Sequence, residues 1–266
     1  MRERIRNMVD FFVIQKGQRA YRQPEEDVYR LAREFAVAQM PAMERSALRL
    51  RNVLDREEPV VFPDERIAFT RTVQTIPTIF LEEELEEIKQ NHWIHERGDV
   101  CNISVDYTRL LDTGLVPKRE ELTERMREWE CEGNEEKAHY CSLQIGILDS
   151  VLALAARYRE KAVQVGNETV ARTLARVPAY APENFLEALQ MLRILHFVMW
   201  CGGNYHNTVG RFDQYMYPYF RRDMDKEIYD EESALELLEE FFLSFNRDSD
   251  LYPGMQQGDN GQSMVL

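Results

Sequence analysis

Apolar residues recur every three to four positions along most of this chain, which is the spacing of an amphipathic helix. From Pro24 to Ala38 they keep this spacing, so we expect a helix that begins at Pro24. Pro41 should interrupt it, with helix resuming through Leu54. The same spacing predicts further helices over residues 82–90, 107–111, 117–129, 138–165, 167–174, 185–200 and 231–245.

Three short apolar runs do not fit this helical pattern. Val60–Pro63 and Ile67–Thr70 are bounded by Pro and Asp, and they predict strands or extended loops. Gln262–Leu266 follows the turn signal Asp259-Asn260-Gly261 and predicts a buried strand. Natural termini are more often polar and frayed, so a stop inside an apolar run suggests a piece of a longer protein. By contrast, the helix over 185–200 is apolar on more than one side and should be buried.

Composition narrows the class of protein. The 266 residues include 47 acidic and 33 basic ones, a formal charge of −14. A surface this acidic argues against nucleic-acid or anionic-membrane partners. There is no run of eighteen apolar residues and no apolar stretch near the N-terminus, so we expect neither a membrane span nor a signal peptide. The four cysteines are too scattered for a disulfide framework, and we expect a cytoplasmic protein with reduced thiols.

A polar loop is the first candidate site. Residues 202–215 begin with two glycines after the buried helix and continue with Asn, His, Asn and Thr. Such loops on rigid scaffolds often bind small molecules, although glycines that simply end a helix would explain the same start. Arg211 and Asp213 are expected to brace each other or the neighbouring backbone rather than to catalyse, because a guanidinium is a poor general base. Asp106 is either the cap of the following helix or a carboxylate of a substrate pocket.

Other chemistry has weaker support. His92, His95 and Asp99 could hold a metal if they shared one helix face, but exposed histidines at a helix end explain them better. Cys101 is the only candidate for a reactive thiol, whereas Cys141 and Cys201 lie in apolar helical contexts expected to be core. No Ser-His-Asp signature, phosphate-binding loop or dinucleotide fingerprint is present.

The segment that follows the polar loop is the most distinctive. Residues 210–220 read Gly-Arg-Phe-Asp-Gln-Tyr-Met-Tyr-Pro-Tyr-Phe, and they closely resemble a motif of the glycyl radical enzymes related to pyruvate formate-lyase. The motif positions are Gly210, Arg211, Asp213, Gln214 and Tyr215. Supporting similarity follows in order over residues 106–115, 176–179, 185–190 and 232–242, so the resemblance spans about Gln18 to Leu266.

The resemblance implies a fold and a chemistry. The fold would be a predominantly helical α/β protein, the N-terminal part of a β/α barrel built from two half-barrels wrapped by helices, with residues 1–266 as one truncated domain. The chemistry would be radical: a backbone glycyl radical, installed by a radical SAM activating enzyme, generates a thiyl radical on a cysteine. The family's Gly-Cys-x-Glu and Arg-Val-x-Gly-Tyr segments are missing here. The chain should therefore lack catalytic residues, the C-terminal glycyl radical domain and any cofactor of its own.

The same resemblance supplies the candidate substrate-binding residues. Thr208 keeps a hydroxyl at a position where the family has a substrate-contacting serine, and His206 stands at another serine position. Asn102 and Asp106 are the remaining pocket candidates. Amides, hydroxyls and one carboxylate suit a small polar metabolite.

Two main hypotheses therefore stand beside the weaker metal-protein alternative. In the first, the chain is the N-terminal segment of a radical lyase or dehydratase, with a small-molecule substrate, an activating enzyme as partner of the full-length protein and possible homo-oligomers. In the second, it is a non-catalytic binding or assembly module that complements a second chain.

Overall fold

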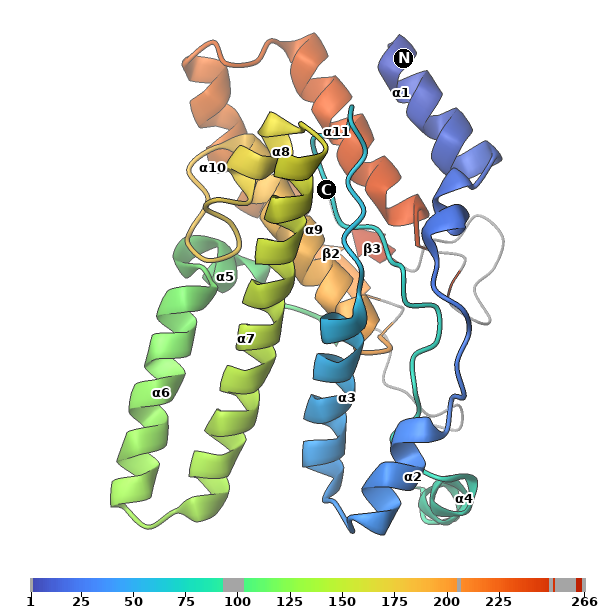
Figure 1. Cartoon of the computed structure of the whole chain (residues 1–266). Coiled ribbons are helices and arrows are strands. Elements are labelled where there is room, and N and C mark those ends of the chain that lie inside the picture. Colours follow the sequence, from blue (N-terminus) through green and yellow to red (C-terminus); the bar gives the residue numbers. More distant parts are fainter. Residues whose placement is uncertain (1, 93–102, 205–206, 249–250, 252–261, 265–266) are drawn as a thin grey trace.

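The computed structural model describes residues 2–92, 103–204, 207–248, 251 and 262–264, and most of this part is helical (Figure 1). In chain order the elements are α1 (Glu3–Val9), the π-helical turn η1 (Asp10–Ile14), the 3₁₀ turn η2 (Gly17–Tyr21), α2 (Arg30–Val37), α3 (Ala42–Arg56), α4 (Glu82–Gln90), β1 (Ile103–Ser104), α5 (Tyr107–Thr113), α6 (Leu115–Cys131), α7 (Glu135–Gln164), α8 (Glu168–Thr173), α9 (Phe185–Cys201), β2 (Asn207–Gly210), α10 (Phe212–Asp225), α11 (Glu231–Asn246) and β3 (Gln262–Met264).

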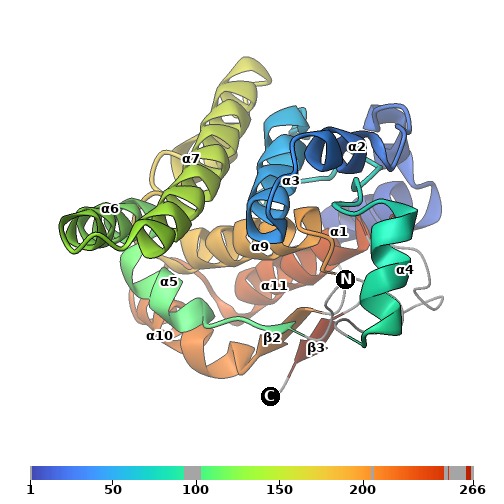
Figure 2. The ribbon, with the colours of Figure 1, turned by 90° about the horizontal axis from the view of Figure 1, so that it is seen from below.

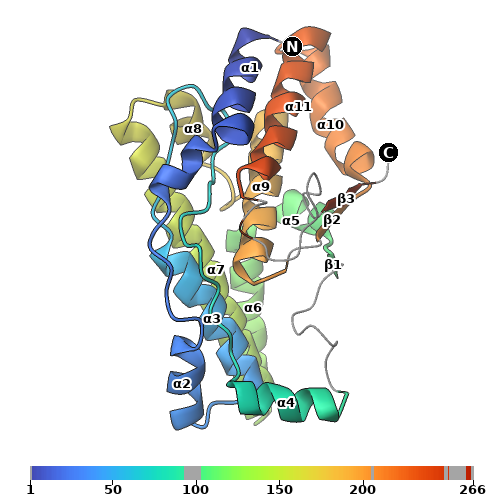
Figure 3. The same cartoon turned by 90° about the vertical axis from the view of Figure 1, so that its right-hand side faces the viewer.

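The helices cover one side of a small sheet. Figures 2 and 3 show β1, β2 and β3 at one side of the molecule, with α9 and α11 between them and α3. Helix α9 contacts α3, α5, α8, α10 and α11, which explains why it is apolar on more than one side, as the sequence predicted. Phe197 and Trp200 of α9 are fully buried in the main core.

The three strands are parallel and lie in the order β1-β2-β3. Helices α5 to α9 connect β1 to β2, and α10 and α11 lie between β2 and β3 in the chain, as parallel pairing requires crossover connections. The strand predicted at the end of the chain is confirmed over 262–264. By contrast, β1 and β2 were not predicted, because two to four residues are too short for a period-of-two pattern to stand out.

The apolar runs at residues 60–63 and 67–70 form loops and not strands, and Phe69 has a φ of 82°. Residues 67–70 are nevertheless fully buried, so their backbone groups need partners inside the protein. Side chains supply these partners: Ala68 N–H donates to Gln190 Oε1 at 2.8 Å, and Thr70 N–H to the Tyr158 hydroxyl at 3.2 Å. The neighbouring helices therefore replace the strand that would otherwise pair with this segment.

The predicted helix start at Pro24 is wrong, because α2 begins only at Arg30. The segment before α2 uses its backbone donors elsewhere. Gln23 N–H donates to the Thr72 carbonyl at 2.8 Å, and Glu26 N–H to the Thr75 hydroxyl at 3.0 Å. Residues 23–26 thus lie along residues 72–75, and this pairing prevents an early helix. The helix expected after Pro41 is confirmed as α3, and α4 and α11 agree closely with their predicted ranges.

Helix α7 is the one helix, within the described ranges, that length and composition would allow to cross a membrane. Its most apolar 18-residue window has a mean hydropathy of 1.3, although no single apolar run is that long. Core helices of soluble proteins pass the same test, so one such helix is weak evidence for a membrane span. About a third of that window is buried (33%), and Val151, Leu154 and Tyr158 of α7 lie in the main core.

Candidate functional site

The candidate site lies where the three parallel strands end. Residues Ser104, Thr208 and Ser263 occupy one row of the sheet, because Ser104 pairs with Thr208 and Thr208 with Ser263. Parallel strands present their carboxyl ends at the same edge, and ligands of open α/β sheets bind at that edge. Asp106 follows β1 and Arg211 follows β2, so the structure brings segments more than 100 residues apart to one edge.

Strand β2 separates a core face from an opposite face. Asn207 and Val209 are buried, and Val209 belongs to the main core. Thr208 lies between them, and alternate residues of a strand point to opposite faces. Its side chain is only partly buried, and Thr208 Oγ1 accepts a hydrogen bond from Gly210 N–H at 2.9 Å. This hydrogen bond restrains the hydroxyl that the sequence assigned to the substrate pocket.

Asp106 caps a helix, which is one of the two roles that the sequence predicted for it. It is the N-cap of α5, and its Oδ1 accepts a hydrogen bond from Arg109 N–H at 3.3 Å. The cap places the exposed carboxylate beside the carboxyl end of β1. The adjacent Tyr107 is buried, and burial raises the pKa of its phenol well above the usual range. Tyr107 therefore remains a neutral hydroxyl near this edge.

The motif after β2 forms a compact local brace. Arg211 Nε and Nη2 donate to the two carboxylate oxygens of Asp213 at 3.0 and 2.9 Å, as the sequence suggested. Because this exposed pair engages both carboxylate oxygens, and a guanidinium is a poor general base, it favours bracing over catalysis. Tyr215 lies one turn further along α10, and its hydroxyl donates to the Val209 carbonyl at 2.6 Å. The role of Tyr215 was not predicted, because nothing in the sequence pattern indicates which backbone carbonyl its hydroxyl would reach.

Several predicted residues lie outside the described part of the chain. These are Asn102 and His206 of the pocket prediction, and His95, Asp99 and Cys101 of the weaker interpretations. Helix α4 ends at Gln90, so His92 is not on that helix. Among the described residues no group of three or more His, Cys, Asp or Glu side chains could hold a metal ion. Cys141 and Cys201 are buried as expected, and burial raises the pKa of the Cys201 thiol.

Asn207 is a further polar residue that the sequence did not single out, because its segment was interpreted as a loop. Its side chain is fully buried, and Nδ2 donates to the Asn204 carbonyl at 2.8 Å. This bond closes the short connection between α9 and β2. Asn207 Oδ1 accepts no hydrogen bond in the structure as described. Buried amide oxygens without a partner are uncommon. Asn207 is therefore, after Thr208, a second candidate polar group of the site on this strand.

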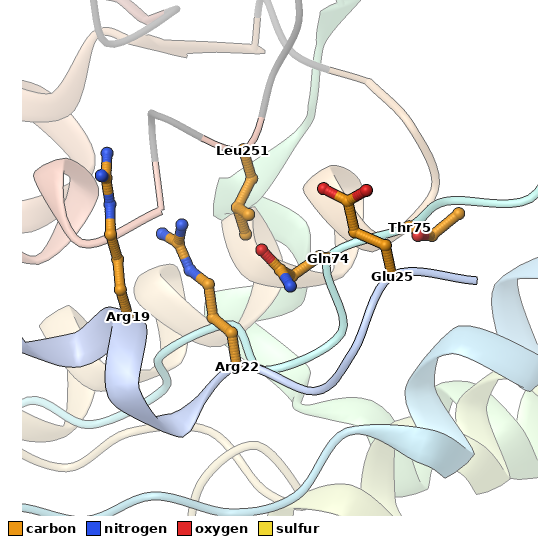
Figure 4. Close-up of a pocket in the computed structure, with 6 residues that line it drawn as sticks. All are labelled: Arg19, Arg22, Glu25, Gln74, Thr75 and Leu251. Carbon is orange, nitrogen blue, oxygen red and sulfur yellow. The ribbon is translucent and has the colours of Figure 1, made fainter.

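A separate hollow of about 400 Å³ lies beside the turn η2 (Figure 4). Arg19 and Arg22 extend into it side by side, with Gln74 and Leu251 facing them. Its lining comes from residues 19–25, 74–75 and 251, and none of it from the described strands. Two guanidinium groups and the Glu25 carboxylate line this hollow, but none of the predicted site residues does, so we place the candidate site at the strand edge.

Comparison with solved structures identifies the class of fold. A glycyl radical enzyme from Archaeoglobus fulgidus superposes with a TM-score of 0.69 at 20% sequence identity. The match covers 92% of this chain and 40% of that one. The chain therefore has the fold of part of a glycyl radical enzyme, which confirms the fold class expected from the sequence. The described strands show three members of a sheet, and no closed barrel is seen among them.

Sequence comparison then gives the family. The family described as "Pyruvate formate lyase-like" matches residues 80–264, so this chain belongs to that family. The trans-4-hydroxy-L-proline dehydratase of Clostridioides difficile is 34% identical over 111 residues, covering 37% of this chain and 14% of the relative. The (2S)-3-sulfopropanediol dehydratase of Klebsiella oxytoca is 27% identical over 181 residues, covering 62% and 22%. The aligned part thus represents about a fifth or less of these relatives' length.

Proposed function

We propose that this chain supplies part of the substrate-binding wall of a glycyl radical dehydratase or lyase that acts on a small polar metabolite. The observation that supports the proposal is the strand edge in a member of this family: Thr208 pairs with Ser104, and Asp106 follows Ser104 by two residues. A restrained hydroxyl and an exposed carboxylate are groups that bind substrate hydroxyl or ammonium groups. Relatives named as dehydratases of hydroxylated compounds support the same reaction class.

The radical step itself is assigned to no residue of this chain. The resemblance requires a cysteine in a Gly-Cys-x-Glu context and a glycine in an Arg-Val-x-Gly-Tyr context, and neither segment occurs in the 266 residues. We expect no turnover by this chain alone after treatment with a radical SAM activating enzyme. Turnover under those conditions would show that the assignment of its role as scaffold and pocket wall is wrong.

Ligand binding tests the pocket directly. The polypeptide expressed from its native gene would be titrated calorimetrically with trans-4-hydroxy-L-proline, (2S)-3-sulfopropanediol and glycerol. We expect at least one to bind, and we expect Thr208→Val to weaken that binding about tenfold, the effect of one lost hydrogen bond. Thr208→Ser should retain binding because it keeps the hydroxyl. Thr113→Val, an exposed threonine on α5, is the matched control.

The result can reject the proposal in two ways. If none of the three compounds binds, the substrate class is wrong. If one binds and Thr208→Val binds it as tightly as the unchanged protein, the site is not at this strand edge.

A second candidate function has one specific observation in its favour. In the described sheet β1 and β3 each pair with β2 alone, so each leaves one edge open. Open edges can accept strands from another chain, as an assembly module would require. Native mass measurement tests this candidate, which predicts a complex with a second chain; a stable, isolated monomer would contradict it.

A further inference from the structure

Strand β2 contains an irregularity at the candidate site. Thr208 pairs with Ser263, but the next pair is Gly210 with Met264, so β2 has one more residue than β3 over this interval. The extra residue is Val209. Such bulges are rare in parallel pairs and occur next to active sites, where they redirect a side chain. Gly210 has φ of 56°, which a glycine adopts without strain, and this allows the chain to leave the bulge toward α10.

One peptide unit at the bulge is held at both ends. The peptide that joins Val209 to Gly210 has its carbonyl on Val209 and its N–H on Gly210. The Tyr215 hydroxyl donates to that carbonyl at 2.6 Å, and the N–H donates to Thr208 Oγ1 at 2.9 Å. Because a peptide is planar and trans, its C=O and N–H point in opposite directions and rotate together. The two hydrogen bonds are therefore mechanically coupled.

The surroundings suit Tyr215 to this role. Tyr215 lies on α10, one turn after the Arg211–Asp213 brace, so its position relative to β2 is fixed by a short, regular segment. Burial raises the pKa of its phenol far above neutrality, which keeps the hydroxyl protonated and able to donate. Its ring lies 6.0 Å from the Tyr107 ring and 6.0 Å from the Phe212 ring, centroid to centroid. These neighbours restrict the directions in which the phenol can move.

We propose that Tyr215 is a positioning residue: by holding the Val209–Gly210 peptide it sets the orientation of the Thr208 hydroxyl. The functional part of this inference rests on the proposed role of Thr208 in the substrate pocket. The geometric part does not, since it concerns only a peptide and the two side chains that hold it. Loss of the Tyr215 hydroxyl should let the peptide rotate and release Gly210 N–H from Thr208 Oγ1.

Hydrogen exchange of the Gly210 amide tests the geometric part. We would compare Tyr215→Phe with the unchanged protein by NMR on ¹⁵N-labelled samples. Phenylalanine keeps the ring and its packing, so only the hydroxyl is lost. We expect exchange at Gly210 to accelerate about tenfold or more, while amides of α9 exchange at unchanged rates. Thr208→Val removes the acceptor itself and is the benchmark for full release. Tyr217→Phe, on the same helix but 56% exposed, is the matched control and should change nothing.

Two results would overturn the inference. In one, Tyr215→Phe leaves Gly210 exchange as it was. In the other, exchange accelerates equally at Gly210 and throughout α9, which would mean a general loss of stability. Binding of trans-4-hydroxy-L-proline, (2S)-3-sulfopropanediol and glycerol to the same variants separates the two proposals. If Gly210 exchange responds but no protein binds any of the three compounds, Tyr215 holds the peptide and the proposed substrate class fails.

Discussion

At the scale of single residues, the interior of this protein contains paired charges. Glu57, Glu65 and Asp248 are fully buried carboxylates, and each forms an ion pair with a fully buried arginine. The partners are Arg71, Arg247 and Arg193 respectively. The pairs join Arg71 to the end of α3, Glu65 to the end of α11, and α9 to Asp248, which follows α11. Removing one member of such a pair leaves an uncompensated buried charge, which costs about 3–5 kcal/mol.

Glu65 should make the stability of the fold depend on pH. Burial raises the pKa of its carboxyl from 4.5 to about 7, although Arg247 opposes the shift. A carboxyl with a higher pKa in the folded state binds its proton more tightly there. Its stabilising contribution is therefore present below pH 4.5 and is lost as the pH rises toward 7. The loss should be on the order of 3 kcal/mol, since one pKa unit corresponds to about 1.4 kcal/mol.

Urea unfolding at pH 5 and pH 8 would measure this effect. From pH 5 to pH 8, we expect the free energy of unfolding to fall less in Glu65→Gln than in the unchanged protein. Glu58→Gln, an exposed glutamate in the same segment, should keep the full pH dependence. Equal pH dependence in all three proteins would show that Glu65 is ionised alike in the folded and unfolded chains.

At the scale of elements, the sequence predicts those helices and helix caps that local signals determine. Periodicity identified α3, α4, α7, α9 and α11, because each contributes an apolar face over several turns or carries clear end signals. Capping also acts locally: Asp230 accepts a hydrogen bond from Ser233 N–H, as expected of an N-cap. The early start assigned to α2 failed because the partners of residues 23–26 are about 50 residues away in the chain. Such pairings leave no trace in a local pattern.

The candidate site, too, could be predicted only in part from the sequence. Asp106 and Thr208 could be singled out by residue type and motif, and the structure places them at one strand edge. The row shared by Thr208 with the other two strands could not be predicted, since register depends on the whole sheet. Tyr215 was recognised only as part of a motif, because its role depends on a bulge that involves β3.

Asn167 shows how one cap can serve two elements. Its Oδ1 accepts from Val170 N–H and caps α8. Its Nδ2 lies 2.9 Å from the Phe62 carbonyl oxygen and 2.8 Å from that of Glu65, so it also donates to the loop at residues 62–65. We expect Asn167→Asp to keep the cap but lower the free energy of unfolding by about 1–3 kcal/mol, because carbonyl oxygens then lose their donor and face a carboxylate.

The matched control is Asn134→Asp at the start of α7. Asn134 caps that helix in the same way, through Lys137 N–H, and the substitution is chemically identical. We expect little change there, since aspartate is as good a cap as asparagine. Chemical denaturation of the two variants makes the comparison. Equal losses of stability would mean that the amide donor of Asn167 contributes nothing beyond capping.

At the scale of the whole molecule, the N-terminal helix is attached separately from the main core. Ile5, Met8 and Phe12 pack with Leu243 in a second, small apolar cluster. Ion pairs add to this attachment, and they link the start of the chain to a helix more than 220 residues later. Figure 3 shows α1 lying along α11. An element with few apolar contacts opens at lower free energy than the core does.

Arg4 should therefore control how readily α1 opens. Its guanidinium reaches Glu236 Oε1 at 2.7 Å, Glu240 Oε2 at 2.6 Å and the Asp64 carbonyl at 2.8 Å. Glu240 is fully buried, so this pair is shielded from salt far more than a surface pair would be. We expect Arg4→Met to accelerate hydrogen exchange of α1 amides about tenfold while α9 is unaffected. Arg2→Met removes contacts to the more exposed Glu232 and to Glu236, and it should have a smaller effect. If both variants accelerate exchange alike, burial of the Glu240 partner does not decide the attachment. If neither variant changes the exchange of α1, the small apolar cluster holds α1 without the ion pairs.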